Sequence, residues 1–273
     1  MQASIAPTID LVAVKARQQA TWASGDYSAV ATLIVPVAER LLDLADVQAG
    51  ARVLDVATGS GNAALAAARF GCEVTGTDYV ESLLDRARER AEAERLLVEF
   101  VLGDAEEIEY PAGSFDAVVS VFGSMFAPDH RRTAAEMLRV TRPGGIVALA
   151  SWTPDGFIGE LFRTVGSFIP SPAGLEPPAL WGTAAHLEEI FGAGLVWRHA
   201  TETFTFRFAS AEAFVEYFTT FYGPTLKAAE TLGTRAVELE SAIAELVRRW
   251  NRLGGDAAVA VPSTYLASVG VRT

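Results

Sequence analysis

Apolar runs alternate with amphipathic stretches through the first half of the chain. The runs have the length and the Val, Ile and Phe content of buried strands, at residues 52–58, 72–78, 97–103, 115–121 and 145–152. Helical spacing lies between most of them, at 62–70, 82–96 and 130–141, with Ser82 expected as an N-cap. The acidic segment 104–114 instead joins the third and fourth strands. This order predicts an α/β fold with a parallel sheet covered on both faces and sites at the carboxyl ends of its strands.

The second half has a different pattern. A loop is expected at residues 154–182, which carry many of the prolines and a group of aromatic residues, a composition typical of a lid or a substrate wall. A short helix (183–192), a strand (195–208), two helical stretches (211–222 and 225–253) and a closing strand near 256–271 are expected to follow. We expect one domain, with a helical cap at 1–50, a ligand-binding core at 51–153 and extra elements at 154–273, because no polar linker separates a second domain.

Composition narrows the class of protein. Half of the 273 residues are apolar, which is enough for a large core, and a net charge of −12 disfavours binding to nucleic acid or to anionic lipid. Nowhere in the sequence do about 18 apolar residues follow one another, so no membrane-spanning helix is predicted. The single cysteine, Cys72, cannot form an internal disulfide, and no CxxC motif or His/Cys cluster indicates zinc. We expect a cytoplasmic protein that acts on small molecules; the sequence indicates no oligomeric state.

A glycine-rich turn follows the first strand. Gly59 and Gly61 form a GxGxxA pattern between a strand and a helix, and NAD, FAD and S-adenosylmethionine sites all use such a turn. Asp55 precedes the turn, and a fixed carboxylate suits a sulfonium cation better than a pyrophosphate. Asp78 ends the second strand, where a carboxylate can accept both ribose hydroxyls, and Asp104 follows the third strand, near an expected adenine.

Simpler roles exist for the same carboxylates. Asp55 and Asp104 could cap helices or loops, and Asp78 could be a turn residue at the end of a strand. Their placement at successive strand ends favours a ligand site. An NAD-type oxidoreductase remains an alternative, and so does a protein that binds S-adenosylmethionine without catalysis.

The motifs together resemble a known family. The stretches VLDVATGSG, VTGTDYVESLLDRAR, LGDAEEIEYPAGSFDAVVSVFG and EMLRVTRPGGIVALASW resemble class I S-adenosylmethionine-dependent methyltransferases of the ubiquinone/menaquinone-biosynthesis-like (type 11) group, over roughly residues 50–155. The resemblance implies a Rossmann-like sheet of seven strands, mostly parallel, with an antiparallel last strand. It also implies S-adenosylmethionine as cofactor. Ala57 and Thr58 stand where the family often has Gly and Cys, and residues 156–273 do not match the quinone enzymes, so their substrate is not carried over.

The resemblance also implies a set of cofactor-binding residues. The glycine turn would lie along the methionine moiety, the end of the second strand at the ribose, the end of the third strand at the adenine, and the end of the fourth strand beside the reactive methyl group. The expected residues are Asp55, Ala57, Gly59, Gly61, Asp78, Tyr79, Leu83, Asp104, Ala105, Glu106, Val121 and Phe122.

The methyl acceptor leaves weaker signals. After the fourth strand the chain reads VFGSM, not the Asn-Pro-Pro-aromatic turn that the wider superfamily uses for amide and exocyclic amine acceptors, and no magnesium motif is evident, so no metal is assigned. Aromatic residues gather at strand ends and in the later segments, although helical spacing as in Phe214, Phe218 and Phe221 is more typical of core packing. The others are Phe122, Phe126, Trp152, Phe157, Phe162, Phe168, Trp181 and Tyr222.

The expected function follows from these signals. We expect methyl transfer to a small, largely apolar or aromatic acceptor, by oxygen, carbon or nitrogen attack in that order of preference. His130, after the fourth strand, is the candidate general base, with a surface position in a first helical turn as its alternative reading. Trp22 and Tyr27 could close over the cofactor or simply pack on the sheet.

Overall fold

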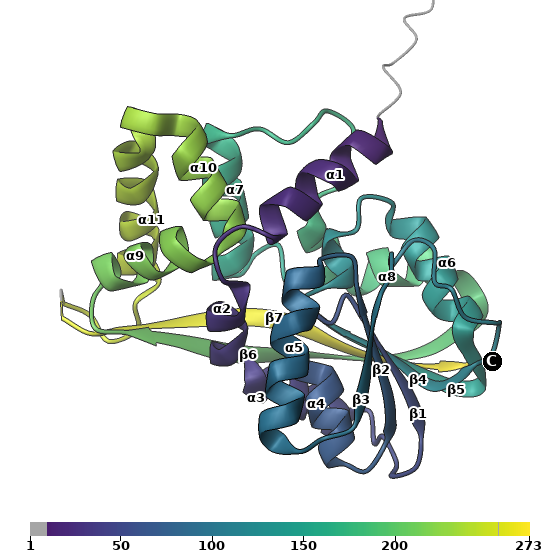
Figure 1. Ribbon diagram of the computed structural model, residues 1–273. Coiled ribbons are helices and arrows are strands. Elements are labelled where there is room, and N and C mark those ends of the chain that lie inside the picture. The colour runs from purple at the N-terminus through teal and green to yellow at the C-terminus, as the bar shows by residue number, and fades with distance from the viewer. Residues whose placement is uncertain (1–9, 256) are drawn as a thin grey trace, which may run out of the picture.

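One mixed sheet forms the centre of the molecule (Figure 1). The computed structural model describes residues 10–255 and 257–273. Strand order is β3-β2-β1-β4-β5-β7-β6. Strands β1 to β5 are parallel to one another, whereas β7 runs antiparallel to both β5 and β6. The strands are β1 (Arg52–Val56), β2 (Glu73–Asp78), β3 (Val98–Leu102), β4 (Phe115–Val121), β5 (Thr141–Trp152), β6 (Leu195–Phe208) and β7 (Val259–Arg272). The predicted seven-stranded Rossmann-like sheet with an antiparallel last strand is confirmed.

Helices cover both faces of the parallel part. The crossover helices α4 and α5 lie on one face, with α3 packed on α4, and α6 lies on the other face, with α8 packed on it, as expected for right-handed crossovers. Helices α7, α9, α10 and α11 pack together near one end of the long β6–β7 pair (Figure 1). The helices are α1 (Leu11–Trp22), α2 (Tyr27–Leu33), α3 (Val35–Leu44), α4 (Asn62–Arg69), α5 (Glu81–Glu94), α6 (His130–Val140), α7 (Phe157–Phe168), α8 (Ala184–Phe191), α9 (Ala211–Phe221), α10 (Gly223–Leu232) and α11 (Ala236–Trp250), with 3₁₀ turns η1 (Ser124–Phe126), η2 (Pro178–Gly182), η3 (Gly192–Gly194) and η4 (Gly233–Arg235).

Three local predictions were wrong. Residues 154–182 are not one loop, because α7 fills their first half; its apolar residues have helical spacing, and only its flanks carry the prolines. The single helix predicted at 225–253 is interrupted at Gly233, whose φ of +56° ends α10. Ser82 is not an N-cap, since α5 begins at Glu81 after Val80. The N-terminal helices are present from Leu11 onward, and residues 1–9 lie outside the described residues.

The sheet has a topological switch between β1 and β4, where the strand order reverses. Ala57 and Phe122, just beyond the ends of these two strands, both have positive φ values, of +53° and +55°. Such backbone strain in non-glycine residues is concentrated at functional sites. Gly123 allows the two strand ends to approach closely, because a Cβ atom there would collide with the Ala57 carbonyl. In the described part of the chain, no helix is both long enough and apolar enough to cross a membrane.

Candidate active site

A cavity of about 850 Å³ opens at the carboxyl ends of β1, β2, β3 and β4, beneath α1 and α2. This is the position that a doubly wound sheet gives to its ligand. Nine of the twelve predicted cofactor-binding residues line it: Ala57, Gly59, Asp78, Tyr79, Leu83, Asp104, Ala105, Val121 and Phe122. The structure does not bring Asp55, Gly61 and Glu106 to this wall.

Asp78 lies at the end of β2 with its side chain against the glycine turn. Its Oδ2 accepts a hydrogen bond from the Gly59 amide at 2.9 Å, and its Oδ1 accepts one from the Val80 amide at 2.9 Å. Burial raises the pKa of Asp78 to about 6, against the opposing effect of these amides. Each carboxylate oxygen keeps a lone pair, so the group can hold the turn and still accept hydrogen bonds from a ligand.

Asp55 is buried behind the turn and does not face the cavity. Its Oδ2 accepts hydrogen bonds from the Thr58 hydroxyl (2.6 Å) and from the Ala64 amide (2.9 Å), so it joins β1 to the first turn of α4. Burial raises its pKa to about 7 against the opposing effect of the two hydrogen bonds, and the nearby negative charge of Asp78 adds a smaller increase. Asp55 therefore shapes the glycine turn from within.

Gly61 is also a packing position. Its φ is +88°, and a Cβ atom there would come within 3.2 Å of Ala87 and 3.3 Å of Phe100. Glycine at this position lets α4 begin in a left-handed turn against α5 and β3.

Lys15 is a cavity residue that the sequence did not indicate. It extends from α1, and its Nζ lies 2.5 Å from Asp104 Oδ2 and 2.6 Å from Glu106 Oε2. Burial acts to lower the pKa of Lys15, but its contacts with the two carboxylates raise it above the ordinary value. Gln19, one turn further along α1, donates to the Tyr79 carbonyl. The acidic character of segment 104–107 could have indicated a basic partner, but Lys15 lies 89 residues from Asp104 in the sequence.

A second cavity of about 390 Å³ adjoins the first and shares Trp22, Tyr27, Ile34, Phe122 and Phe126 with it. Among the residues that the structure describes, no charged side chain lines this second cavity. Its remaining lining residues are Val30, Trp152, Ile158, Leu161, Phe162, Phe206, Phe218 and Tyr222.

The aromatic residues singled out in the sequence divide between cavity and core. Six of them line the second cavity: Phe122, Phe126, Trp152, Phe162, Phe218 and Tyr222. Phe157, Phe168, Trp181 and Phe221 do not. Phe214 is fully buried and stacks on Phe218 at 4.1 Å between ring centroids. Of these two residues on the same face of α9, Phe214 therefore packs in the core and Phe218 lines the second cavity.

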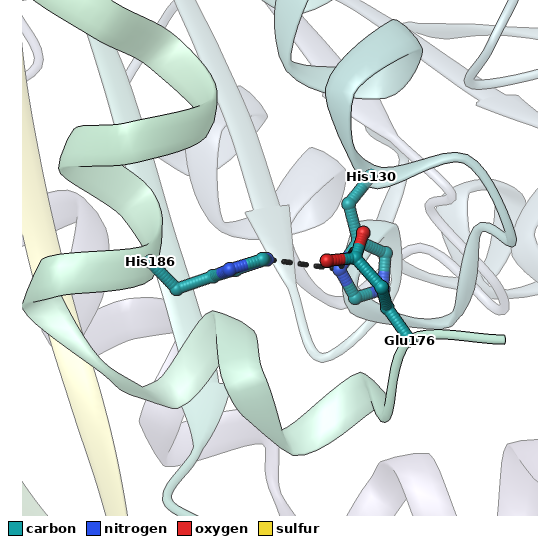
Figure 2. Close-up of side chains that lie close together, drawn as sticks. All are labelled: His130, Glu176 and His186. Atoms are coloured by element: carbon teal, nitrogen blue, oxygen red, sulfur yellow. Dashed lines mark hydrogen bonds and ion pairs between the residues drawn. The ribbon is translucent and has the colours of Figure 1, made fainter. Parts of the chain in front are cut away.

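His130 lines neither cavity. It is the first residue of α6 and is 1% exposed, which also contradicts the alternative reading as a surface histidine. Its Nδ1 lies 2.9 Å from His186 Nε2, and Glu176 lies beside the pair (Figure 2). Burial, together with the neighbouring His186, lowers the pKa of His130 to about 4.

Comparison with known proteins identifies the family. Residues 54–149 match the sequence model of a family described as a methyltransferase domain. The chain is 38% identical over 242 residues to an uncharacterized protein of Mycobacterium tuberculosis, covering 86% of this chain and 88% of that protein. It is 42% identical over 116 residues to a demethylmenaquinone methyltransferase of Deinococcus radiodurans, covering 41% of this chain and 48% of that enzyme. The chain belongs to the class I S-adenosylmethionine-dependent methyltransferases.

The cofactor of the methyltransferase is therefore S-adenosylmethionine, and the NAD-type oxidoreductase alternative is set aside. A putative methyltransferase from Bacillus halodurans shares the fold, with a TM-score of 0.59 and 21% identity over 86% of this chain and 97% of that one. The alignment with the Deinococcus enzyme covers less than half of this chain and less than half of that enzyme. The acceptor must consequently be inferred from this chain's own cavities.

Proposed function

We propose that the methyltransferase methylates a small, largely apolar or aromatic acceptor bound in the second cavity. The observation that carries this proposal is the uncharged, aromatic lining of that cavity and its junction with the first. Aromatic and aliphatic walls favour a flat apolar ligand, and a charged acceptor would lose its hydration there without gaining an ionic partner. A protein that bound S-adenosylmethionine without catalysis would have no need of such a cavity.

We place the cofactor along the strand ends in the first cavity. Asp78 would accept from the ribose hydroxyls, and Asp104 from the adenine amino group with the Ala105 amide beside the ring. Ala57 and Gly59 would follow the methionine moiety. Four further residues complete the proposed contacts: Tyr79 at the ribose, Leu83 near it, and Phe122 with Val121 beside the methyl group, where the two cavities meet.

The three predicted residues off this wall keep indirect roles in the proposal. Asp55 and Gly61 would act through the shape of the glycine turn. Glu106 would act through Lys15, which it helps to hold beside Asp104.

The chemistry requires alignment more than bond-breaking assistance. The acceptor atom attacks the methyl carbon in line with the leaving sulfur, and the charge of the sulfonium disappears as the bond breaks, so a dry, apolar site favours the reaction. Burial raises the pKa of both Tyr27 and Tyr222 above the ordinary range, so their hydroxyls stay protonated. They can donate to an acceptor oxygen, which is why we keep oxygen ahead of carbon and nitrogen.

His130 is not kept as the general base in this proposal. It lies outside both cavities, and its lowered pKa makes it a weak base at neutral pH. We also propose that the whole chain works as one catalytic domain, since residues of α1 and α2 cover the cofactor cavity and residues 152–222 complete the acceptor cavity.

Methyl transfer to a panel of acceptors tests the proposal. The protein is incubated with unlabelled S-adenosylmethionine and matched phenols, apolar carbon acids, amines and charged analogues, and products are detected by the gain of about 14 Da that follows when a methyl group replaces a hydrogen. Apolar aromatic hydroxyl compounds should be the better substrates. Preferential turnover of charged acceptors would overturn the assignment.

A matched pair of variants locates the acceptor. Phe162 lines the second cavity, whereas Phe168 lies on the same helix and lines neither cavity. Phe162→Ala should raise the acceptor KM about 10-fold, the equivalent of losing part of one aromatic contact, and leave cofactor affinity unchanged. Phe168→Ala should change neither. Equal effects of the two variants on KM would place the acceptor elsewhere.

A further inference from the structure

Three side chains from separate segments converge at the start of α6 (Figure 2). His130 begins α6, His186 lies in α8, and Glu176 lies in the loop that precedes η2. His130 Nδ1 is 2.9 Å from His186 Nε2 and 3.7 Å from Glu176 Oε2, and one ligand atom from each residue lies within 4.8 Å of the others. Two imidazoles and a carboxylate at this spacing form a typical donor set for a transition metal.

Burial gives the pair of histidines an unusual environment. His130 is 1% and His186 8% exposed, and the ring of the buried Trp181 packs against His130 in a T-shaped arrangement. Burial lowers the pKa of both imidazoles, so they are neutral at pH 7. The lone pairs of neutral imidazoles are what a metal requires, and protons compete for them only weakly.

A hydrogen bond between the histidines leaves the carboxylate unexplained. One imidazole N–H can donate to the other ring, and this uses both facing nitrogens. Glu176 then faces a neutral pair at 3.7 Å, beyond hydrogen-bonding distance, and in the described residues its carboxylate accepts no other hydrogen bond. A divalent cation would satisfy all three groups at once.

We propose that His130, Glu176 and His186 bind one zinc ion. Zinc–ligand bonds of about 2.0–2.1 Å in tetrahedral geometry separate the ligand atoms by roughly 3.3 Å. The separations of 2.9 Å and 3.7 Å lie on either side of this value and all three ligand atoms lie within 4.8 Å of one another, so side-chain adjustments alone would bring them to this spacing. The imidazole that donates the present hydrogen bond would move its proton to its other ring nitrogen, and no net proton would be released.

This zinc ion would have a structural role. None of its three ligands lines either cavity, so neither the cofactor nor the acceptor reaches it, and water would complete the coordination. The ion would fasten α8 and the loop around Glu176 to the start of α6. Pro128, two residues before His130, lines the cofactor cavity, so the fastening would stiffen that wall. This proposal departs from the sequence-based expectation of no metal, which considered only motifs local in sequence.

Zinc titration of the full-length chain tests the site. The protein is stripped with EDTA, freed of chelator, and titrated with zinc in competition with a chromophoric chelator. We expect one equivalent per chain. Glu176→Gln keeps the size of the half-exposed side chain but removes its charge, and His186→Gln removes a nitrogen ligand; each should weaken binding at least about 100-fold.

His199 provides the matched control. It is the third histidine of the chain, it hydrogen-bonds to Ser268, and it has a glutamate, Glu188, at the same 3.7 Å distance, but it has no second imidazole beside it. His199→Gln should bind zinc like the wild type. Zinc at about 100 times its dissociation constant should raise the Tm of wild type and His199→Gln by about 5 °C, and that of Glu176→Gln hardly at all.

The outcomes separate this proposal from the proposed function. S-adenosylmethionine affinity measured without metal should be equal in wild type and Glu176→Gln, which shows that the variant is folded. Equal zinc affinity in these two proteins, loss of binding in His199→Gln, or no stoichiometric binding by the wild type would each overturn the zinc site. None of these results would alter the assignment of the two cavities.

Discussion

The buried carboxylate of Asp55 makes a prediction about stability and pH. Asp55→Asn keeps the shape of the side chain, and its amide oxygen can still accept from the Thr58 hydroxyl and the Ala64 amide, which both reach a single oxygen in the wild type. Only the ability to ionise is lost. The variant therefore isolates the electrostatic contribution of a group that the sequence marked as a ligand of the cofactor.

The direction and size follow from proton linkage. Burial raises the pKa of Asp55 from 3.8 to about 7 in the folded protein. A group with a raised folded pKa contributes stability that is complete below its unfolded pKa and is lost as the pH rises through the folded pKa. A difference of about three pKa units corresponds to about 4 kcal/mol. About 3 kcal/mol of this should disappear between pH 5 and pH 8, because two of the three units lie in that range.

Denaturant unfolding at pH 5, 6, 7 and 8 measures the effect. The wild type should lose about 3 kcal/mol of unfolding free energy relative to Asp55→Asn over this range, and the variant should be the more stable protein at pH 8. Asp116→Asn is the control, since the Arg52 amide and Arg142 lower the pKa of Asp116 and its titration lies below the range. Parallel pH profiles for the wild type and Asp55→Asn would refute the reasoning.

Two further predictions concern ligand binding and the helical cover. Asp55→Asn should weaken the binding of S-adenosylmethionine and of S-adenosylhomocysteine by factors that differ less than about threefold, because Asp55 faces away from the cavity and is partly protonated at pH 7. Calorimetric titration of both ligands checks this, and a tenfold difference between the two factors would show that the Asp55 charge faces the sulfonium. Lys15→Met removes the ionic contacts of Lys15 with Asp104 and Glu106 and should speed chymotrypsin cleavage at Trp22. The control Arg40→Met breaks the exposed pair with Glu202 and should not change the cleavage rate. Equal cleavage rates in the two variants would mean that Lys15 does not hold α1 in place.

Much of the fold was predictable because its parallel strands are buried on both faces. Such strands read as continuous apolar runs, and β1 to β4 lie within two residues of their predicted bounds, whereas β5 begins four residues earlier than predicted, at Thr141. The prediction was wrong at α7, where glycine and proline at the flanks masked a helical repeat of Phe157, Leu161 and Val165. Composition was the weaker signal there, and periodicity was the one to follow.

The cofactor cavity was predictable for a related reason. Parallel strands bring their carboxyl ends together, so residues such as Asp78 and Asp104 meet wherever the sheet forms. A carboxylate before a glycine turn can face a ligand or hold the turn, and for Asp55 only burial distinguishes the two. The contact of Lys15 with Asp104 could not be predicted in the same way, because it depends on how α1 folds back over the sheet.

The acceptor cavity and the histidine cluster were not predictable as sites. Their residues come from segments far apart in the chain, as His130 and Glu176 illustrate, and no local motif joins them. Only the packing of the later helices and loops onto the sheet creates these neighbourhoods.

The placement of the ribose at Asp78 is the central claim about the cofactor site, and one calorimetric comparison tests it. S-adenosylmethionine and its 2′,3′-dideoxy analogue are each titrated into the wild type and Asp78→Ala, with circular dichroism to confirm folding. The account predicts that Asp78→Ala weakens S-adenosylmethionine about 10- to 200-fold, and that removing the hydroxyls costs the wild type a similar factor but costs the variant little. Unchanged S-adenosylmethionine affinity in the folded variant, or an equal penalty for the analogue in both proteins, would contradict it.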